Sequence, residues 1–379
     1  MRHSAAPLAA MVLLAIVMSG CEHGQAVPAP SNSPIPPTGS PVPTRLAAKT
    51  LVALGPRGVG ALDCGAAYIA WPTDSKPIVN QIVPRRDIVE VVPLDGGQPR
   101  IVATAKHGGD LDSPVPITEP WLVYIEYQQH RQSSSANFWF LNAVNLTTGQ
   151  FVGLAGATTG RPLEELPRYA VSDGRAVWDQ LDTAGTPVLR LHDFGSGSTT
   201  TLGLPRRAYP VNPAIVGDNV IFVDNSTDPN SSQEDWLGRR GSLRRYDIST
   251  GQTTTLDADP TAYAVQTAGS QVVWLALPAA GPSSIKTVPV TGGPVNVIGN
   301  YSGLPQTNGA IVVWYDSQAH GFMKFGLQTT RLEPLQIGDW SDPQGPYALC
   351  GNRMYFAVAP GYDGGTSTVR YVDLTSAVQ

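Results

Sequence analysis

The stretch Ala262–Asn300 reads AYAVQTAGSQVVWLALPAAGPSSIKTVPVTGGPVNVIGN and carries the pattern that decides the fold. Its apolar and β-branched runs predict four short β-strands in succession: Ala262–Gln266, Gln271–Leu277, Ile285–Val290 and Val295–Ile298. Glycine-containing turns at Gly269-Ser270 and Gly292-Gly293 separate these strands, with a longer loop between the second and the third. The stretch is therefore predicted to be one antiparallel four-stranded unit.

Variants of this unit recur along most of the chain, at a spacing of about 40–50 residues. The other units begin near residues 60, 113, 167, 208, 303 and 343. One four-stranded sheet cannot bury both of its faces, whereas sheets stacked face to face in a ring can. The second strands VVWLAL, IVVWYD and NVIFVD are apolar on both sides, which fits burial between neighbouring sheets. We therefore predict an all-β fold, a seven-bladed β-propeller of four-stranded antiparallel blades over residues 48–379.

The two ends of this repeat array predict how the ring closes. The seventh unit lacks a fourth strand, and a spare apolar strand, Thr50–Leu54, precedes the first unit. We expect this strand to complete the last blade, because an unpaired edge would otherwise remain. Cys64 and Cys350 each precede a glycine at the turn between a first and a second strand. Closure makes their units neighbours, so we predict a Cys64–Cys350 disulfide; the alternative is two unrelated buried thiols.

Tryptophan recurs at a matching place in the second strands of four units, at Trp71, Trp178, Trp274 and Trp314. We expect these side chains to pack between blades, because large aromatic rings dominate the energetics of buried cores. The alternative is a platform on which a ligand stacks.

The N-terminus has the architecture of a signal peptide. Residues 1–20 combine Arg2, an apolar run over Leu8–Met18 and small residues before Cys21, and this run is too short to span a bilayer. Met18-Ser19-Gly20-Cys21 resembles the bacterial lipobox, in which signal peptidase II cuts before the cysteine and acyl chains are attached to it. The resemblance implies a protein anchored through Cys21 to the extracytoplasmic face of the cell membrane. The alternative is a plain secretory signal.

Residues 21–47 are then the lipidated cysteine and a linker. Positions 23–44 contain no Asp, Glu, Lys or Arg, and seven prolines lie between Pro28 and Pro43. This composition indicates a semi-rigid polyproline spacer with no means of forming a core.

Two motifs connect the repeats to a known family. RYDISTG at Arg245–Gly251 and NLTTG at Asn145–Gly149 follow apolar strands, and Val171-Ser172-Asp173-Gly174 matches part of a recurrent Ser-Pro-Asp-Gly turn. In these features residues 50–379 resemble the TolB-type, WD40-like propellers of bacterial envelopes. The resemblance implies a propeller fold and a role in interactions, and it carries over no catalytic residue.

The sequence argues against several classes of functional site. The net charge of −5 argues against a generic nucleic-acid binder. The sequence has no Gly-Xaa-Ser-Xaa-Gly elbow, and its six histidines are dispersed without zinc-ligand spacing. Ser172-Asp173-Gly174 is similar to part of a sialidase Asp box but does not repeat, so we interpret it as a turn. We expect no metal and no cofactor.

One polar insertion, Asp224–Asp235, places oxygen side chains at the spacing of an EF-type calcium loop. Pro229 stands where that loop requires glycine, and proline cannot adopt the left-handed turn. We therefore expect a solvated loop, with calcium binding as the alternative.

A local arginine cluster follows this insertion: Arg239, Arg240, Arg244 and Arg245. Guanidinium groups bind phosphate or carboxylate bidentately, so the cluster is a candidate anion site. On a strand Arg244 and Arg245 point to opposite faces, which limits convergence. The alternative is that the arginines cover apolar surface and pair with nearby Asp.

These features predict a membrane-anchored, monomeric propeller that binds or scaffolds an envelope protein, a peptide or a glycan. The alternative is a propeller enzyme, a glycan lyase or hydrolase, with its site at the central funnel. Paired carboxylates at one mouth would favour the enzyme. A sensor ectodomain is a third, weaker possibility.

Overall fold

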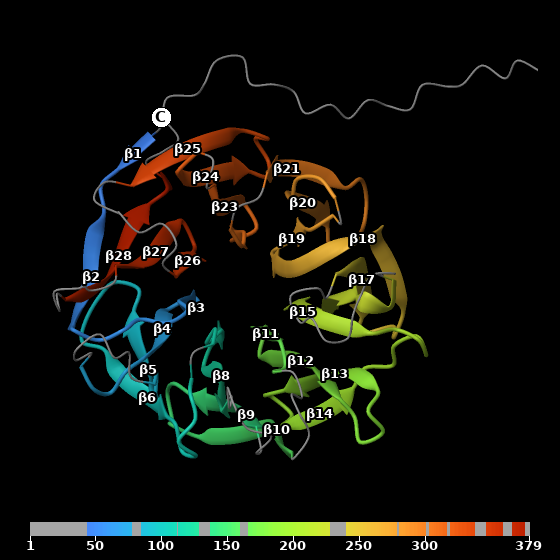
Figure 1. Cartoon of the computed structure of the whole chain (residues 1–379), viewed down its shortest axis with the longest axis horizontal. Coiled ribbons are helices and arrows are strands. Elements are labelled where there is room, and N and C mark those ends of the chain that lie inside the picture. Colours follow the sequence, from blue (N-terminus) through green and yellow to red (C-terminus); the bar gives the residue numbers. More distant parts are fainter. Residues whose placement is uncertain are drawn as a thin grey trace, which may run out of the picture. The chain divides into compact units, whose positions relative to one another are not determined.

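The computed structural model describes residues 44–77, 85–111, 113–128, 137–159, 166–227, 240–278, 280–300, 303–316, 319–337, 346–358 and 366–375. The chain divides into the units Met1–Thr38 and Gly39–Gln379, and all described residues belong to the second. That unit is built almost wholly of β-strands, which form sheets arranged around a central axis (Figure 1).

The described residues form six sheets, and within each repeat the strands follow in chain order. The first is β3 (Asp63–Cys64), β4 (Tyr68–Thr73), β5 (Ile88–Pro93) and β6 (Arg100–Thr104). The second is β7 (Ile117–Thr118), β8 (Trp121–Gln128), β9 (Asn137–Asn145) and β10 (Phe151–Thr159). The third is β11 (Tyr169–Ser172), β12 (Arg175–Leu181), β13 (Pro187–Asp193) and β14 (Ser198–Thr201).

The fourth sheet has seven strands and covers two repeats. Its strands are β15 (Pro210–Val216), β16 (Asn219–Asp224), β17 (Gly241–Asp247), β18 (Thr253–Ala268), β19 (Gln271–Ala276), β20 (Ser284–Pro289) and β21 (Asn296–Asn300), and a 3₁₀-turn, η1 (Asn225–Thr227), follows β16. The predicted strand Ala262–Gln266 is therefore not separate. Few residues separate it from the preceding outer strand, so the backbone stays extended and β18 pairs with both β17 and β19.

The last two sheets lie where the ends of the described chain meet. One contains β22 (Gln306–Thr307), β23 (Ile311–Asp316), β24 (Gly321–Gly326) and β25 (Leu332–Ile337). The other contains β26 (Tyr347–Cys350), β27 (Arg353–Val358) and β28 (Ser367–Asp373). β2 (Lys49–Gly55) pairs antiparallel with β28 and completes that sheet, as the spare strand at Thr50–Leu54 predicted.

A second N-terminal strand, β1 (Thr44–Leu46), was not expected. It pairs in parallel with β25, so Leu46 lies opposite Ile337. Leu46 is buried in the core shared by the last two sheets. The propeller therefore includes Thr44–Leu46, which the sequence assigned to the linker, because backbone pairing and one buried leucine hold this segment to the sheet.

The core lies between neighbouring sheets. One cluster joins Val313 and Phe322 of one sheet to Met354 and Phe356 of the next. The recurrent tryptophans Trp71, Trp178, Trp274 and Trp314 are at most 1% exposed, which confirms that they pack between sheets and do not form an open platform. The apolar second strands have this composition because they are covered on both faces.

Candidate functional site

A cavity of about 870 Å³ lies on the central axis and takes lining residues from the inner strand or entry segment of every repeat. Most of its walls are Pro, Ala, Val, Leu and Ile side chains. Uncharged polar groups come from Gln266, Thr267, Gln306 and Thr307. A cavity of this size, apolar with a few convergent polar groups, is the default candidate for ligand binding.

Two tyrosines at this cavity have structural roles for their hydroxyl groups. The Tyr169 hydroxyl donates to the Pro114 carbonyl, and the Tyr347 hydroxyl donates to the Leu304 carbonyl. Each tyrosine is the first residue of an inner strand, and its hydroxyl contacts a carbonyl of the preceding repeat. Each hydroxyl thus ties neighbouring inner segments together, and the ring faces remain as cavity wall.

Asp63 supplies the one charge among the described lining residues. Its Oδ1 accepts a hydrogen bond from the Cys64 backbone N–H at 2.8 Å. The Asp63 side chain is half-buried in the cavity wall, and this burial raises its pKa to about 6. The hydrogen bond from the Cys64 N–H acts in the opposite direction, but its effect on the pKa is smaller. Because no second carboxylate lines the cavity in the described residues, the carboxylate pair expected of a glycan hydrolase is not found among them.

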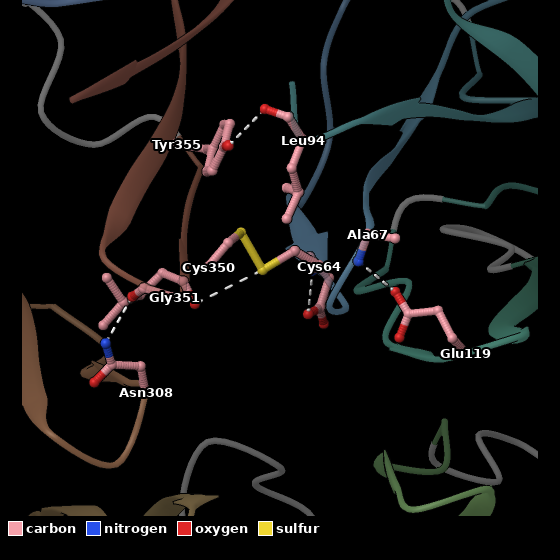
Figure 2. Close-up of a disulfide and its surroundings, with 10 residues drawn as sticks. Cys64, Ala67, Leu94, Glu119, Asn308, Cys350, Gly351 and Tyr355 are labelled. Atoms are coloured by element: carbon pink, nitrogen blue, oxygen red, sulfur yellow. Dashed lines mark hydrogen bonds between the residues drawn. A yellow bond between two sulfur atoms is a disulfide. The ribbon is translucent and has the colours of Figure 1, made fainter. Parts of the chain in front are cut away.

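Contacts between turns link neighbouring repeats on both sides of a disulfide (Figure 2). The structure contains the Cys64–Cys350 disulfide, whose Cα atoms are 6.0 Å apart. On one side of it, Asn308 Nδ2 donates to the Gly351 carbonyl at 2.6 Å. On the other side, the Ala67 N–H donates to Glu119 Oε1 at 2.9 Å. These three links join four consecutive repeats across the seam where the ring closes.

The linkage continues around the ring at the same turns. The Gly174 N–H donates to Thr118 Oγ1 at 2.8 Å, and the Gly217 N–H donates to Asp173 Oδ2 at 2.9 Å. Asp173 and Gly174 both have positive φ, so the Ser172-Asp173-Gly174 motif is a tight turn, as predicted. The Ser172 hydroxyl and the Gly217 N–H hold the pKa of Asp173 below its usual value. These bonds link the corresponding turns of six consecutive repeats, from the sixth through the seventh and first to the fourth.

Buried carboxylates recur at the opposite ends of the second strands, and the sequence analysis missed them. Their oxygens accept N–H groups from the segment that enters the same repeat: Gly58 N to Asp74 at 2.9 Å, His107 N to Glu126 at 2.6 Å, Arg168 N to Asp179 at 2.7 Å and Tyr209 N to Asp224 at 3.0 Å. The signal was present in the sequence, because an acidic residue closes the apolar run in YIAWPTD, YIE, VWD and VIFVD.

Two of these carboxylates differ in electrostatics. Burial raises the pKa of Asp179 to about 7, although the Arg168 and Asn212 N–H groups favour its charged form. Burial also acts to raise the pKa of Glu126, but the N–H groups of Lys106, His107 and Gly109 and the His107 ring outweigh it, so this pKa lies below its usual value. Asp179 is the more strongly desolvated of the two and lacks a side-chain donor such as the His107 ring, and both differences favour its higher pKa.

The arginine cluster is divided among separate contacts. Arg244 Nε lies 2.8 Å from the buried Asp224 Oδ2, whereas Arg245 donates to the Val290 carbonyl and Arg240 to the Leu277 carbonyl. Arg239 lies outside the described residues. The Arg244 contact is the pairing with a nearby Asp that the alternative describes, and anion binding by the cluster stays a prediction.

The calcium-loop hypothesis falls largely on residues outside the described part, since only 224–227 of that insertion are described. Asp224 there binds its own neighbours, with Ser226 Oγ donating to Oδ1 at 2.6 Å. Within the described ranges, no group of three or more His, Cys, Asp or Glu side chains could hold a metal ion. Nor does that part of the chain contain a helix long and apolar enough to cross a membrane.

Comparisons with known proteins establish the fold of this chain and no function for it. No family model and no curated protein matches the sequence. The β-propeller domain of the Trilobed protease from Pyrococcus furiosus aligns with a TM-score of 0.55 at 9% identity, covering 84% of this chain and 95% of that one. An oligogalacturonate lyase solved in complex with manganese aligns with a TM-score of 0.54 at 10% identity, covering 90% and 99%. The chain therefore has a β-propeller fold.

TolB from Acinetobacter baumannii is also among the similar structures, at 14% identity with a TM-score of 0.39. The alignment covers 76% of this chain and 61% of TolB, so this chain spans less than two thirds of it. At this similarity the alignment supports no argument about function.

Proposed function

We propose that the protein is a lipid-anchored, extracytoplasmic, seven-bladed propeller that acts as a monomeric binding module for an envelope protein, peptide or glycan. The count of seven assigns β18 to two blades and gives β2 to the blade of β26, β27 and β28. The single observation that carries the binding function is the axial cavity of about 870 Å³, to which every repeat contributes lining residues.

The shape of the cavity favours binding over catalysis. Its walls are apolar with neutral polar groups, and turns of neighbouring repeats are tied together by hydrogen bonds and the disulfide. A preformed site loses little conformational freedom when a ligand enters, which favours affinity. Asp63 is the single carboxylate among the described residues that line the cavity, and one carboxylate does not favour the lyase or hydrolase alternative.

The proposal is tested by probing arrays of envelope peptides and glycans with the labelled full-length protein in detergent. The variant Ala170→Trp with Gln266→Trp places two indoles in the cavity wall, and Thr200→Trp with Val297→Trp places them on exposed outer strands as the control. We expect array signals that the cavity variant loses and the control keeps. Signals that survive in the cavity variant would place binding elsewhere.

The anchor has its own test. In bacteria that express the full chain, a labelled palmitate analogue should be incorporated into the wild type and not into Cys21→Ser, and only the wild type should sediment with membranes. Two or three acyl chains anchor a protein durably, at about 0.8 kcal/mol per buried CH₂. An unlabelled wild type, or a membrane-bound Cys21→Ser, would contradict this part of the proposal.

A further inference from the structure

Asp63 places one negative charge in a cavity that is otherwise neutral in the described residues. Its β3 strand lies beside β26, and the cavity brings Gln266 and Gln306 from across the ring to the same space. Burying an ionised carboxylate is costly unless a cation or several donors accompany it. The described cavity walls supply one donor to this carboxylate, the Cys64 N–H, and no cation that would balance its charge.

No basic side chain forms an ion pair with Asp63 among the described residues. The titratable groups that neighbouring elements present at the cavity are Tyr169, Tyr315 and Tyr347, and Glu119 lies beside Gly65 two residues along the chain. Asp63 acts on Tyr169 and, with burial, raises the pKa of that phenol. None of these groups offers a positive charge.

We propose that the cavity receives a ligand with a primary ammonium group, such as a lysine side chain or a free peptide amino terminus, and that Asp63 is its counter-ion. This inference rests on the proposed function, because it assigns a ligand class to the same cavity. Oδ1 is already engaged by the Cys64 N–H, which leaves Oδ2 as the main acceptor. One free oxygen suits a compact point donor better than the paired donors of a guanidinium group.

The remaining walls fit such a ligand. Pro, Ala and Leu side chains match an alkyl stem, and the tyrosine rings at the cavity offer π-faces that attract cations. A multivalent metal would need several oxygen ligands, and the cavity has one carboxylate in the described residues. The chemistry therefore favours an organic cation.

The inference predicts a definite pH dependence. Burial raises the pKa of Asp63 to about 6, so the carboxylate is ionised at pH 7.5 and about one tenth ionised at pH 5. An alkylammonium ion stays charged at both values. If the ionised carboxylate binds the ion about tenfold more tightly than the protonated one, the affinity should fall about fivefold on acidification, whereas a neutral ligand of the same shape should not respond.

The test uses n-butylammonium and the neutral 1-butanol as probes of the full-length protein, with dissociation constants from saturation-transfer NMR. At pH 7.5 we expect the wild type to bind n-butylammonium about tenfold more tightly than 1-butanol, the scale of one charge-assisted hydrogen bond. Asp63→Asn keeps an acceptor for the Cys64 N–H and should remove the preference. Asp95→Asn, on a side chain that is 94% exposed outside the cavity, is the matched control and should leave the preference intact.

Each outcome separates this inference from the proposed function. If the two indoles at positions 170 and 266 weaken both probes equally and Asp63→Asn changes nothing, the cavity is a binding site and the ammonium inference is wrong. If the indoles affect neither probe, the cavity itself is not the site and the proposed function fails. An absence of n-butylammonium binding to the wild type also overturns the inference. Should Asp63→Asn not fold, the pH dependence of the wild type decides alone.

Discussion

Loss of the Cys64–Cys350 disulfide should lower the free energy of unfolding by several kcal/mol. The bond joins positions 286 residues apart. In the chain-entropy model, the constraint on an unfolded loop of this length is worth about 6 kcal/mol, and removal of native disulfides typically costs about 2–5 kcal/mol. The bond also spans the seam between the first and the last repeat, where β2 pairs with β28 and the Tyr355 hydroxyl donates to the Leu94 carbonyl at 3.0 Å (Figure 2).

The assay is urea unfolding followed by tryptophan fluorescence, in a Cys21→Ser background so that two of the three cysteines remain. Cys64→Ala, Cys350→Ala and the double variant form a cycle. If the bond exists, each single variant breaks it completely, so the double variant loses no more than a single one beyond small packing changes. Additive single effects, a loss below about 1 kcal/mol, or two free thiols in the native protein would refute the reasoning.

Three further predictions concern titration and packing. Because the pKa values of Asp63 and Asp179 are raised to about 6 and 7, their contribution to stability is present at low pH and lost as the pH rises through these values. Between pH 5 and 8, ionisation of Asp179, which is 5% exposed, should alone lower the free energy of unfolding by about 2 kcal/mol. Asp179→Asn should flatten this dependence of stability on pH, at a cost in stability that does not depend on pH. A stability that rises over this pH range in urea unfolding would contradict the prediction. Gly241→Ala should lower the free energy of unfolding by about 1–3 kcal/mol in chemical unfolding, because the new Cβ would lie 2.1 Å from the Asp224 carbonyl oxygen. Gly203→Ala is the control and should be nearly neutral, because a Cβ there has no atom within 4 Å. Equal effects of the two variants would be evidence against this packing. Trp178→Phe should lower the free energy of unfolding by about 1 kcal/mol more than Trp274→Phe in thermal unfolding. Trp178 Nε1 donates to Gln180 Oε1 at 2.6 Å, whereas the buried Trp274 Nε1 has no hydrogen-bond partner among the described residues. Equal losses of stability would contradict this assignment.

The fold could be predicted because the local sequence pattern of each repeat indicates where its strands lie. Short apolar runs separated by glycine turns predicted β19, β20 and β21 to within two or three residues. The turn positions of Cys64 and Cys350 predicted their contact, because equivalent places in the first and last repeats meet when a ring closes. The spare strand, β2, was predictable for the same reason, since an unpaired edge demands a partner.

The candidate site was much less predictable. Asp63 stands in ALDCG with no motif around it, and its importance comes from the cavity that the inner segments of all repeats enclose together. The carboxylates at the ends of the second strands were visible as a pattern, but their backbone donors lie 11–19 residues upstream, in the segment that enters the repeat. The arginine cluster was visible in the sequence, but only the structure shows the separate partners of Arg244 and Arg245, because alternation along β17 directs adjacent side chains to opposite faces. Anion binding by this cluster stays a prediction.

The sequence by itself determined the kind of strand, the repeat, the closure of the ring and the pairing of the cysteines, because these follow from local periodicity and from the need to bury apolar faces and pair edges. Only the tertiary structure decided that β1 (Thr44–Leu46) adds to β25, that β18 runs unbroken between two repeats, and that Asp63 is the one charged residue among the described residues that line the cavity. These features depend on which distant segments lie side by side, and burial and charge are properties of that neighbourhood and not of the residues alone.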